Sequence, residues 1–113
     1  MAGRSLAAPA CQRSLTIADW TDDPPAAPYP DVTLCAGGSI TFRWASRHGV
    51  ATTPSPDCPP SWTAAAGVKE LAPLAPRGNY TWAAPAAGPA TVHFAYQVSN
   101  HCASGQKFTA QVV

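Results

Sequence analysis

Charged residues are scarce in this sequence, and their scarcity narrows the range of functions. They make up 12% of the 113 residues, about half of the usual ~25%. Seven basic residues nearly balance six acidic ones. Nucleic acids and anionic membrane surfaces are bound through concentrated positive charge. The composition therefore offers no electrostatic basis for binding either of them.

Several sequence patterns that carry chemistry in other proteins are absent as well. No apolar run approaches the roughly 20 residues of a transmembrane helix. There is no Gly-x-Ser-x-Gly, no His-Glu-x-x-His and no paired-carboxylate pattern, so nothing supplies a nucleophile together with its base. No Cys-x-x-Cys pair indicates a structural zinc site. We therefore do not expect an enzyme.

Four widely separated cysteines are the first positive signal in the chain. They are Cys11, Cys35, Cys58 and Cys102. An even number of cysteines in a short chain indicates two disulfides and an oxidising compartment, outside the cell or in the secretory route. Four free thiols in a cytosolic protein are the alternative. Asn79-Tyr80-Thr81 forms an N-glycosylation sequon in an expected turn, which agrees with secretion.

Thirteen prolines restrict helix formation. They crowd into residues 22–31, 53–60 and 73–89. Proline removes a backbone donor and clashes with the preceding turn, so these segments are excluded from helix interiors. The only helix expected is about two irregular turns within Ser61–Leu74, which Gly67 and Pro73 keep short.

Alternation of apolar and polar residues predicts strands in much of the chain. The clearest segments are residues 39–44, 91–98 and 107–112, and weaker ones are residues 15–18, 32–35 and 80–82. Five to seven strands with almost no helix predict a β-sandwich or a small barrel. The chain length fits one domain.

Three histidines are the only side chains that ordinarily titrate near neutral pH. His48 follows the strand that ends at Trp44, and His101 lies in the loop before the last strand. His93 is out of phase with Tyr96, so it is expected to face away from it. A single loop histidine is usually solvated. The histidines become informative only together with their neighbours.

Residues 99–107, Ser-Asn-His-Cys-Ala-Ser-Gly-Gln-Lys, resemble the C-terminal end of the phytocyanins, where Gly-His-Cys-x-x-Gly-Met/Gln-Lys precedes the final strand. Ala36-Gly-Gly-Ser-Ile-Thr-Phe-Arg-Trp44 is similar to the Gly-Asp-x-Leu-x-Phe-x-Tyr strand of that family, and His48-Gly-Val to its His-Asn-Val. The resemblance covers residues 14–113 and leaves residues 1–13 as an N-terminal extension.

The resemblance implies a cupredoxin, an all-β Greek-key sandwich of about seven strands with at most one short helix. In phytocyanins two histidines and a cysteine thiolate hold a type 1 copper, with methionine or glutamine as a weak axial ligand. The matching residues are His48, His101 and Gln106, whereas the cysteine position, five residues before His101, holds Tyr96. The resemblance also implies a disulfide between Cys58 and Cys102, which leaves Cys11 and Cys35 as the second pair.

Tyr96 changes what the implied copper site can do. A thiolate gives the His₂Cys site its strong copper bond and its tuned potential. A phenol, with an ordinary pKa near 10, is protonated at neutral pH and is a poor ligand unless a metal displaces the proton. Two imidazoles and an amide oxygen suit copper(II) in a tetragonal arrangement, but not a blue site. The alternative is that Tyr96 is a core aromatic residue that fills the vacated position.

Two functions therefore stay open. The first is a secreted phytocyanin-like domain that binds copper(II) weakly through two histidines, in a family whose role is extracellular electron transfer. The second is a copper-free module, like the early-nodulin-like branch of the family, that serves in interactions at the cell wall or cell surface. Either function implies a monomer outside the cell with a partner that the sequence does not identify.

Overall fold

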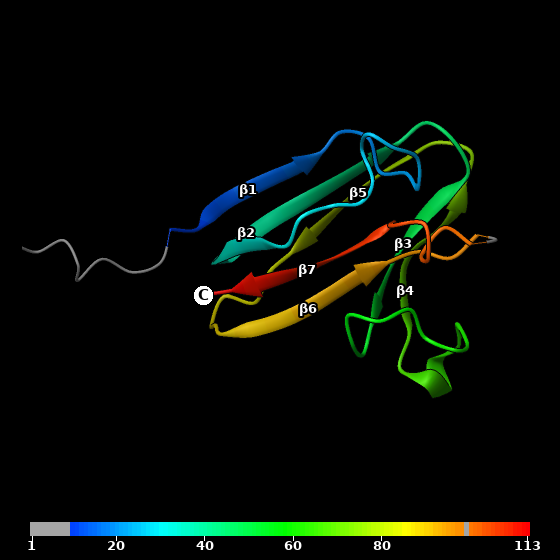
Figure 1. Cartoon of the computed structure of the whole chain (residues 1–113). Helices are drawn as coiled ribbons and strands as arrows, with labels where there is room; N and C mark the ends of the chain where they lie inside the picture. Colours follow the sequence, from blue (N-terminus) through cyan, green and yellow to red (C-terminus); the bar gives the residue numbers. More distant parts are fainter. Residues whose placement is uncertain (1–9, 99) are drawn as a thin grey trace, which may run out of the picture.

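Seven strands account for nearly all regular structure in residues 10–98 and 100–113, which are the residues that this computed structural model describes (Figure 1). The strands are β1 (Gln12–Ile17), β2 (Val32–Trp44), β3 (His48–Thr53), β4 (Lys69–Ala75), β5 (Gly78–Ala83), β6 (Ala90–Ala95) and β7 (Lys107–Val112). A single 3-10 turn, η2 (Ala64–Ala66), is the helical element of the described residues. No helix in these ranges is long and apolar enough to cross a membrane.

The strand order is β1-β2-β7-β6-β3-β4, with β5 paired to β2. The long strand β2 pairs with three other strands along its length. Its residues Val32–Leu34 pair in parallel with β7, whereas Ser39–Trp44 lie between β1 and β5 (Figure 1). The change of partner occurs at Gly37, whose φ of 77° favours glycine, and at Gly38. A Cβ on Gly38 would lie 2.7 Å from the carbonyl oxygen of Arg13.

The all-β Greek-key sandwich expected from the sequence is confirmed, with two corrections to its elements. The helix expected within Ser61–Leu74 is wrong beyond η2, because Lys69–Ala75 forms strand β4. Gly67, in the left-handed conformation with φ 88°, ends the 3-10 turn. The strand expected at residues 91–98 ends at Ala95, so Tyr96 lies just beyond it.

Two candidate site residues lie in strands and not in the loops expected for them. His48 is the first residue of β3, a strand that the sequence patterns did not predict. Asn79 is the second residue of β5 and is not in a turn. Its side chain is exposed, and Asn79 pairs with Arg43 of β2.

Four aromatic rings fill the interior between the layers, and we call them the aromatic core. They are Trp20, Phe42, Phe94 and Phe108, each at most 4% exposed. Ring centroids of the contacting pairs lie 5.1 to 5.9 Å apart. The one polar group in this set is the indole N–H of Trp20, and it donates a 2.7 Å hydrogen bond to the carbonyl oxygen of Gly49.

Two disulfides add covalent links to the strand pairings. One joins Cys11 to Cys35 and ties the start of β1 to β2. The other joins Cys58 to Cys102 and ties the segment after β3 to the loop before β7. His101 lies in that loop, so the second disulfide fixes the backbone beside it.

Candidate metal centre

His48 and His101 come together although they lie on separate segments of the chain. His48 opens β3, and His101 lies in the loop that leads into β7. The centroids of their rings are 4.9 Å apart. His48 is only 3% exposed, and the side chain of His101 is 18% exposed. Neither is the freely solvated side chain that a loop histidine usually is.

Each of these histidines has a polar side chain near Nε2 and no hydrogen-bond partner at Nδ1 among the described residues. Nε2 of His48 lies 2.9 Å from Oγ of Ser46, and Nε2 of His101 lies 3.5 Å from Oδ1 of Asp22. Both Nδ1 atoms are buried without a hydrogen-bond partner among the described residues. Leaving a buried polar atom unpaired costs about 1 to 3 kcal/mol. The two unpaired Nδ1 atoms on neighbouring rings therefore lower the stability of the folded protein.

Gln106 adds two further unpaired atoms to the same region. Its side chain is completely buried, and neither Oε1 nor Nε2 has a partner in the part of the chain that is described. Its backbone N–H donates to the carbonyl oxygen of His101, and its carbonyl oxygen accepts from the N–H of Tyr96. Gln106 is thereby held next to His101. We call His48, His101 and Gln106 the histidine cluster.

The surroundings of His48 favour its neutral form. Burial lowers the pKa of His48 below its ordinary 6.5, and the neighbouring His101 lowers it further. The carboxylates of Asp22, Asp23 and Asp19 act in the opposite direction and are the weaker influence. A neutral imidazole carries one lone pair that can bind a metal. His48 thus remains a competent ligand to a lower pH than an ordinary histidine.

Asp22 is the residue of this site that the sequence analysis missed. Ligand-type atoms of Asp22, His48 and His101 all lie within 4.8 Å of one another. In the sequence Asp22 is only the first residue of a proline-rich segment. No local spacing connects it to either histidine, because the contact is made by two loops distant in sequence.

Hydrogen bonds fix the loop that carries Asp22. The indole of the buried Trp20 is bonded to Gly49, the residue after His48. The backbone N–H of Thr21 donates to the hydroxyl of Tyr29 at 2.8 Å, and that hydroxyl donates to the carbonyl oxygen of Asp19. Asp22 follows directly from these anchored residues, so its position is set by the fold.

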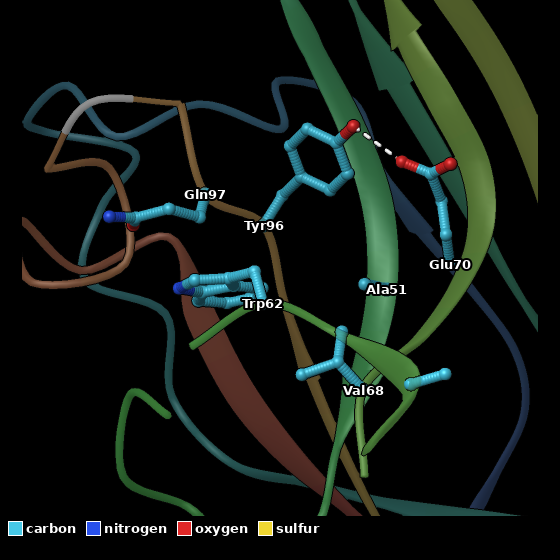
Figure 2. Close-up of a pocket in the computed structure, with 7 residues that line it drawn as sticks. Ala51, Trp62, Val68, Glu70, Tyr96 and Gln97 are labelled. Atoms are coloured by element: carbon cyan, nitrogen blue, oxygen red, sulfur yellow. Dashed lines mark hydrogen bonds between the residues drawn. The ribbon is translucent and has the colours of Figure 1, made fainter. Parts of the chain in front are cut away.

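Tyr96 lies against the residue that follows His48, but its hydroxyl is directed to β4. A Cβ on Gly49 would be 2.6 Å from Cζ of Tyr96. The hydroxyl donates a 2.7 Å hydrogen bond to Oε2 of Glu70, and both side chains line a pocket of about 380 Å³ with Trp62 (Figure 2). Burial and this hydrogen bond raise the pKa of Tyr96 to about 12. The phenol is therefore protonated at neutral pH, and its proton is committed to Glu70.

His93 lies outside the histidine cluster. It is a half-buried residue of β6, and its Nδ1 lies 2.8 Å from Oγ1 of Thr109 on β7. This cross-strand contact satisfies the ring within the sheet. His93 thus differs from His48 and His101, because its Nδ1 has a hydrogen-bond partner.

Comparison with solved structures places this arrangement of strands among known folds. A dithionite-reduced auracyanin from the photosynthetic bacterium Roseiflexus castenholzii has a TM-score of 0.52 and 20% identity over 92% of this chain and 99% of its own. A mutant fern plastocyanin has a TM-score of 0.46 and 16% identity, covering 87% of this chain and 97% of its own. Reduced rusticyanin has a TM-score of 0.46 and 14% identity, covering 74% of this chain and 62% of its own. No protein-family model and no curated protein matches the sequence.

Proposed function

The domain is a cupredoxin-like β-sandwich, and on that premise we propose that it is a secreted, phytocyanin-like domain that binds copper(II) weakly without a type 1 centre. The ligands would be the imidazoles of His48 and His101 and the amide oxygen of Gln106. The observation that carries this proposal is the set of buried, unpaired atoms in the histidine cluster. A metal ion bound by the two Nδ1 atoms and the amide oxygen would compensate the cost of burying these three atoms.

The donor set decides which copper chemistry fits. Imidazole nitrogen and amide oxygen suit copper(II), whereas the soft copper(I) ion prefers the sulfur ligands that this site lacks. The phenol of Tyr96 does not supply the missing negative charge while it is protonated and bonded to Glu70. Copper bound here would supply a redox-active cation, but without the thiolate it would not be the rapid electron carrier of a blue site.

A copper(II) titration followed by electron paramagnetic resonance tests this proposal. We expect one site per chain with nitrogen hyperfine coupling in the wild type. The double variant His48→Ala/His101→Ala should lose that signal. His93→Ala removes an imidazole outside the cluster and should keep the signal. A folded wild type that binds no stoichiometric copper, or a double variant with the wild-type spectrum, contradicts the assignment.

Replacing Tyr96 with cysteine tests whether this position belongs to the same site. Tyr96→Cys, loaded with copper(II), is expected to show the intense thiolate-to-copper absorption of a blue site, whereas the parent stays nearly colourless. Tyr96→Cys/His101→Ala is the control and should lose the band. Circular dichroism must first show that both variants fold, because loss of the ring leaves a cavity. A copper-loaded single variant without the band means that position 96 does not face the histidines.

The second candidate is a copper-free interaction module of the cell wall or cell surface. The contact between Tyr96 and Glu70 favours it, because the phenol then replaces the cysteine as an ordinary partner within the fold. This candidate predicts a folded wild type without a stoichiometric copper signal. The same titration therefore separates the two functions.

Secretion is the part of the proposal that rests on covalent features. The two disulfides agree with an oxidising compartment. Asn79 is exposed on β5, within reach of a glycosylating enzyme. We expect the protein secreted from a glycosylating host to carry a glycan there, and intact mass with Asn79→Gln as the control tests it. An unmodified mass would count against glycosylation of Asn79.

A further inference from the structure

We propose that Asp22 is a positioning residue of the metal centre: it holds His101 in the tautomer that carries its proton on Nε2, so that Nδ1 is free to bind the metal. The predicted effect on copper(II) affinity rests on the proposed function, whereas the tautomer assignment rests only on the contact between Asp22 and His101. Oδ1 of Asp22 lies 3.5 Å from Nε2 of His101.

The tautomer follows from the chemistry of the two groups. A neutral imidazole has one N–H donor and one lone pair. An ionised carboxylate has no proton to donate and repels a lone pair, so Asp22 favours the tautomer whose proton is on the nitrogen that faces it. That nitrogen is Nε2 of His101. The lone pair of His101 is then on Nδ1, which is buried and has no partner among the described residues.

His48 provides a comparison within the same cluster. Its Nε2 lies 2.9 Å from the hydroxyl oxygen of Ser46, and a hydroxyl can donate or accept. Ser46 therefore does not determine the tautomer of His48. The carboxylate of Asp22, near Nε2 of His101, does favour one tautomer of His101. Asp22 therefore leaves the lone pair of one of the two imidazoles on the nitrogen that would bind a metal.

Partial burial and nearby hydrogen bonds support the contact between Asp22 and His101. The side chains of Asp22 and His101 are 21% and 18% exposed, so the pair is partly shielded from water. Trp20 and Thr21 anchor the preceding backbone through their hydrogen bonds to Gly49 and Tyr29. A carboxylate that accepts the outer N–H of a ligating histidine orients the ring and raises its basicity, and its loss typically costs 10- to 100-fold in metal affinity.

Asp23 is a matched control for Asp22. It carries the same charge one residue later, is exposed, and its backbone N–H and one carboxylate oxygen both contact Oγ1 of Thr21. The carboxylates of Asp22 and Asp23 both act on the pKa of His48. A difference between Asp22→Ala and Asp23→Ala therefore reports the contact with His101 and not the loss of one negative charge.

The first measurement is made without metal, by long-range proton–nitrogen NMR of the imidazoles at mildly alkaline pH. We expect the Nε2-protonated tautomer for His101 in the wild type and in Asp23→Ala, and a mixture of tautomers in Asp22→Ala. Asp22→Glu should restore part of the preference. The Nδ1-protonated tautomer in the wild type, or an unchanged His101 in a folded Asp22→Ala, overturns the inference.

The second measurement is a competitive copper(II) titration of the same proteins. Asp22→Ala should bind copper(II) about 10- to 100-fold more weakly, whereas Asp23→Ala should stay within about twofold of the wild type. Equal affinity of Asp22→Ala and the wild type overturns this inference and leaves the proposed function intact. A wild type that has the expected tautomer but binds no copper overturns the proposed function and the role of Asp22 in metal binding, but leaves the tautomer assignment intact.

Discussion

The aromatic core and the histidine cluster treat buried polar atoms in opposite ways. In the aromatic core the only polar group, the indole N–H of Trp20, is hydrogen-bonded. In the histidine cluster four buried nitrogen and oxygen atoms have no partner among the described residues. Most buried polar groups in native proteins are hydrogen-bonded, as the indole of Trp20 is, and unpaired ones are rare. The core therefore contributes to stability, whereas the unpaired atoms of the cluster reduce it, which supports the proposal that the cluster binds a ligand.

Truncating the aromatic core is expected to have the largest effect on stability. Phe42 is fully buried and contacts the rings of Trp20, Phe94 and Phe108. Phe42→Ala should lower the free energy of unfolding by about 3 to 5 kcal/mol, since both transfer energy and a cavity are involved. Denaturant unfolding measures it, with the exposed Val113→Ala as a control expected within about 0.5 kcal/mol. Similar losses in the two variants would contradict this description of the core.

Removing either disulfide should lower the free energy of unfolding by slightly less than the upper limit of about 5 kcal/mol given for Phe42→Ala. Only the removal of Cys58–Cys102 should also disturb the histidine cluster. The separations are 44 residues for Cys58–Cys102 and 24 for Cys11–Cys35. The loop-entropy model then gives about 4 and about 3.4 kcal/mol for the paired alanine variants. Cys102 follows His101, so only the first variant should also weaken copper(II) binding. Equal copper affinities in the two folded variants would show that this disulfide does not position His101.

Replacing the glutamine of the histidine cluster should change stability in the opposite direction. Gln106→Leu keeps a similar volume and removes two unpaired buried atoms, so the metal-free protein should gain about 1 to 2 kcal/mol. The same change should weaken copper(II) binding by removing the amide oxygen. Gln111→Leu is the control, because Gln111 is exposed and accepts a hydrogen bond from Thr91. A destabilised metal-free Gln106→Leu would mean that the amide has partners within the fold.

Residues with a local sequence signal were predictable, and this includes most of the aromatic core. Phe42, Phe94 and Phe108 all fall at the apolar positions of alternating segments, which identify strands directly. Strand β4 gives no such signal, because only Ala72 of its seven residues is buried and Pro73 interrupts it. Its place in the sheet depends on pairing with β3, which local sequence does not encode.

The residues of the candidate site likewise fall into two groups, those with a local sequence signal and those without one. His48 and His101 were found because each sits in a short motif that resembles one in a known family. Asp22 has no such motif, and its contact with His101 depends on the placement of the loop after β1, which the bond from Trp20 to Gly49 of β3 anchors. The bond from Tyr96 to Glu70 likewise joins two strand regions far apart in sequence. Side-chain partners of this kind require the tertiary structure.

The smallest effect expected at neutral pH belongs to Tyr96, but it has a distinctive pH dependence. Tyr96→Phe removes the hydrogen bond from Tyr96 to Glu70, and one such bond typically contributes about 0.5 to 1.5 kcal/mol. The pKa of Tyr96 is raised from 10.0 to about 12 in the folded protein. A raised folded-state pKa gives stability that is fully present below the unfolded-state pKa and is lost as pH rises through the folded-state value. The wild type should therefore lose stability between about pH 10 and about pH 12.

Tyr96→Phe should lack that part of the alkaline loss, because phenylalanine has no proton to release. Tyr80→Phe, a change of the same kind on β5, should keep it. Thermal unfolding of the three proteins across this pH window measures the difference, and the ultraviolet absorbance of tyrosinate shows directly when Tyr96 ionises. Tyr29 also has a raised pKa, mainly because it is buried, so a residual alkaline loss is expected in all three proteins. Parallel curves for the wild type and Tyr96→Phe would mean that the phenol is not committed to Glu70, and Tyr96 would then have to be reconsidered as a ligand.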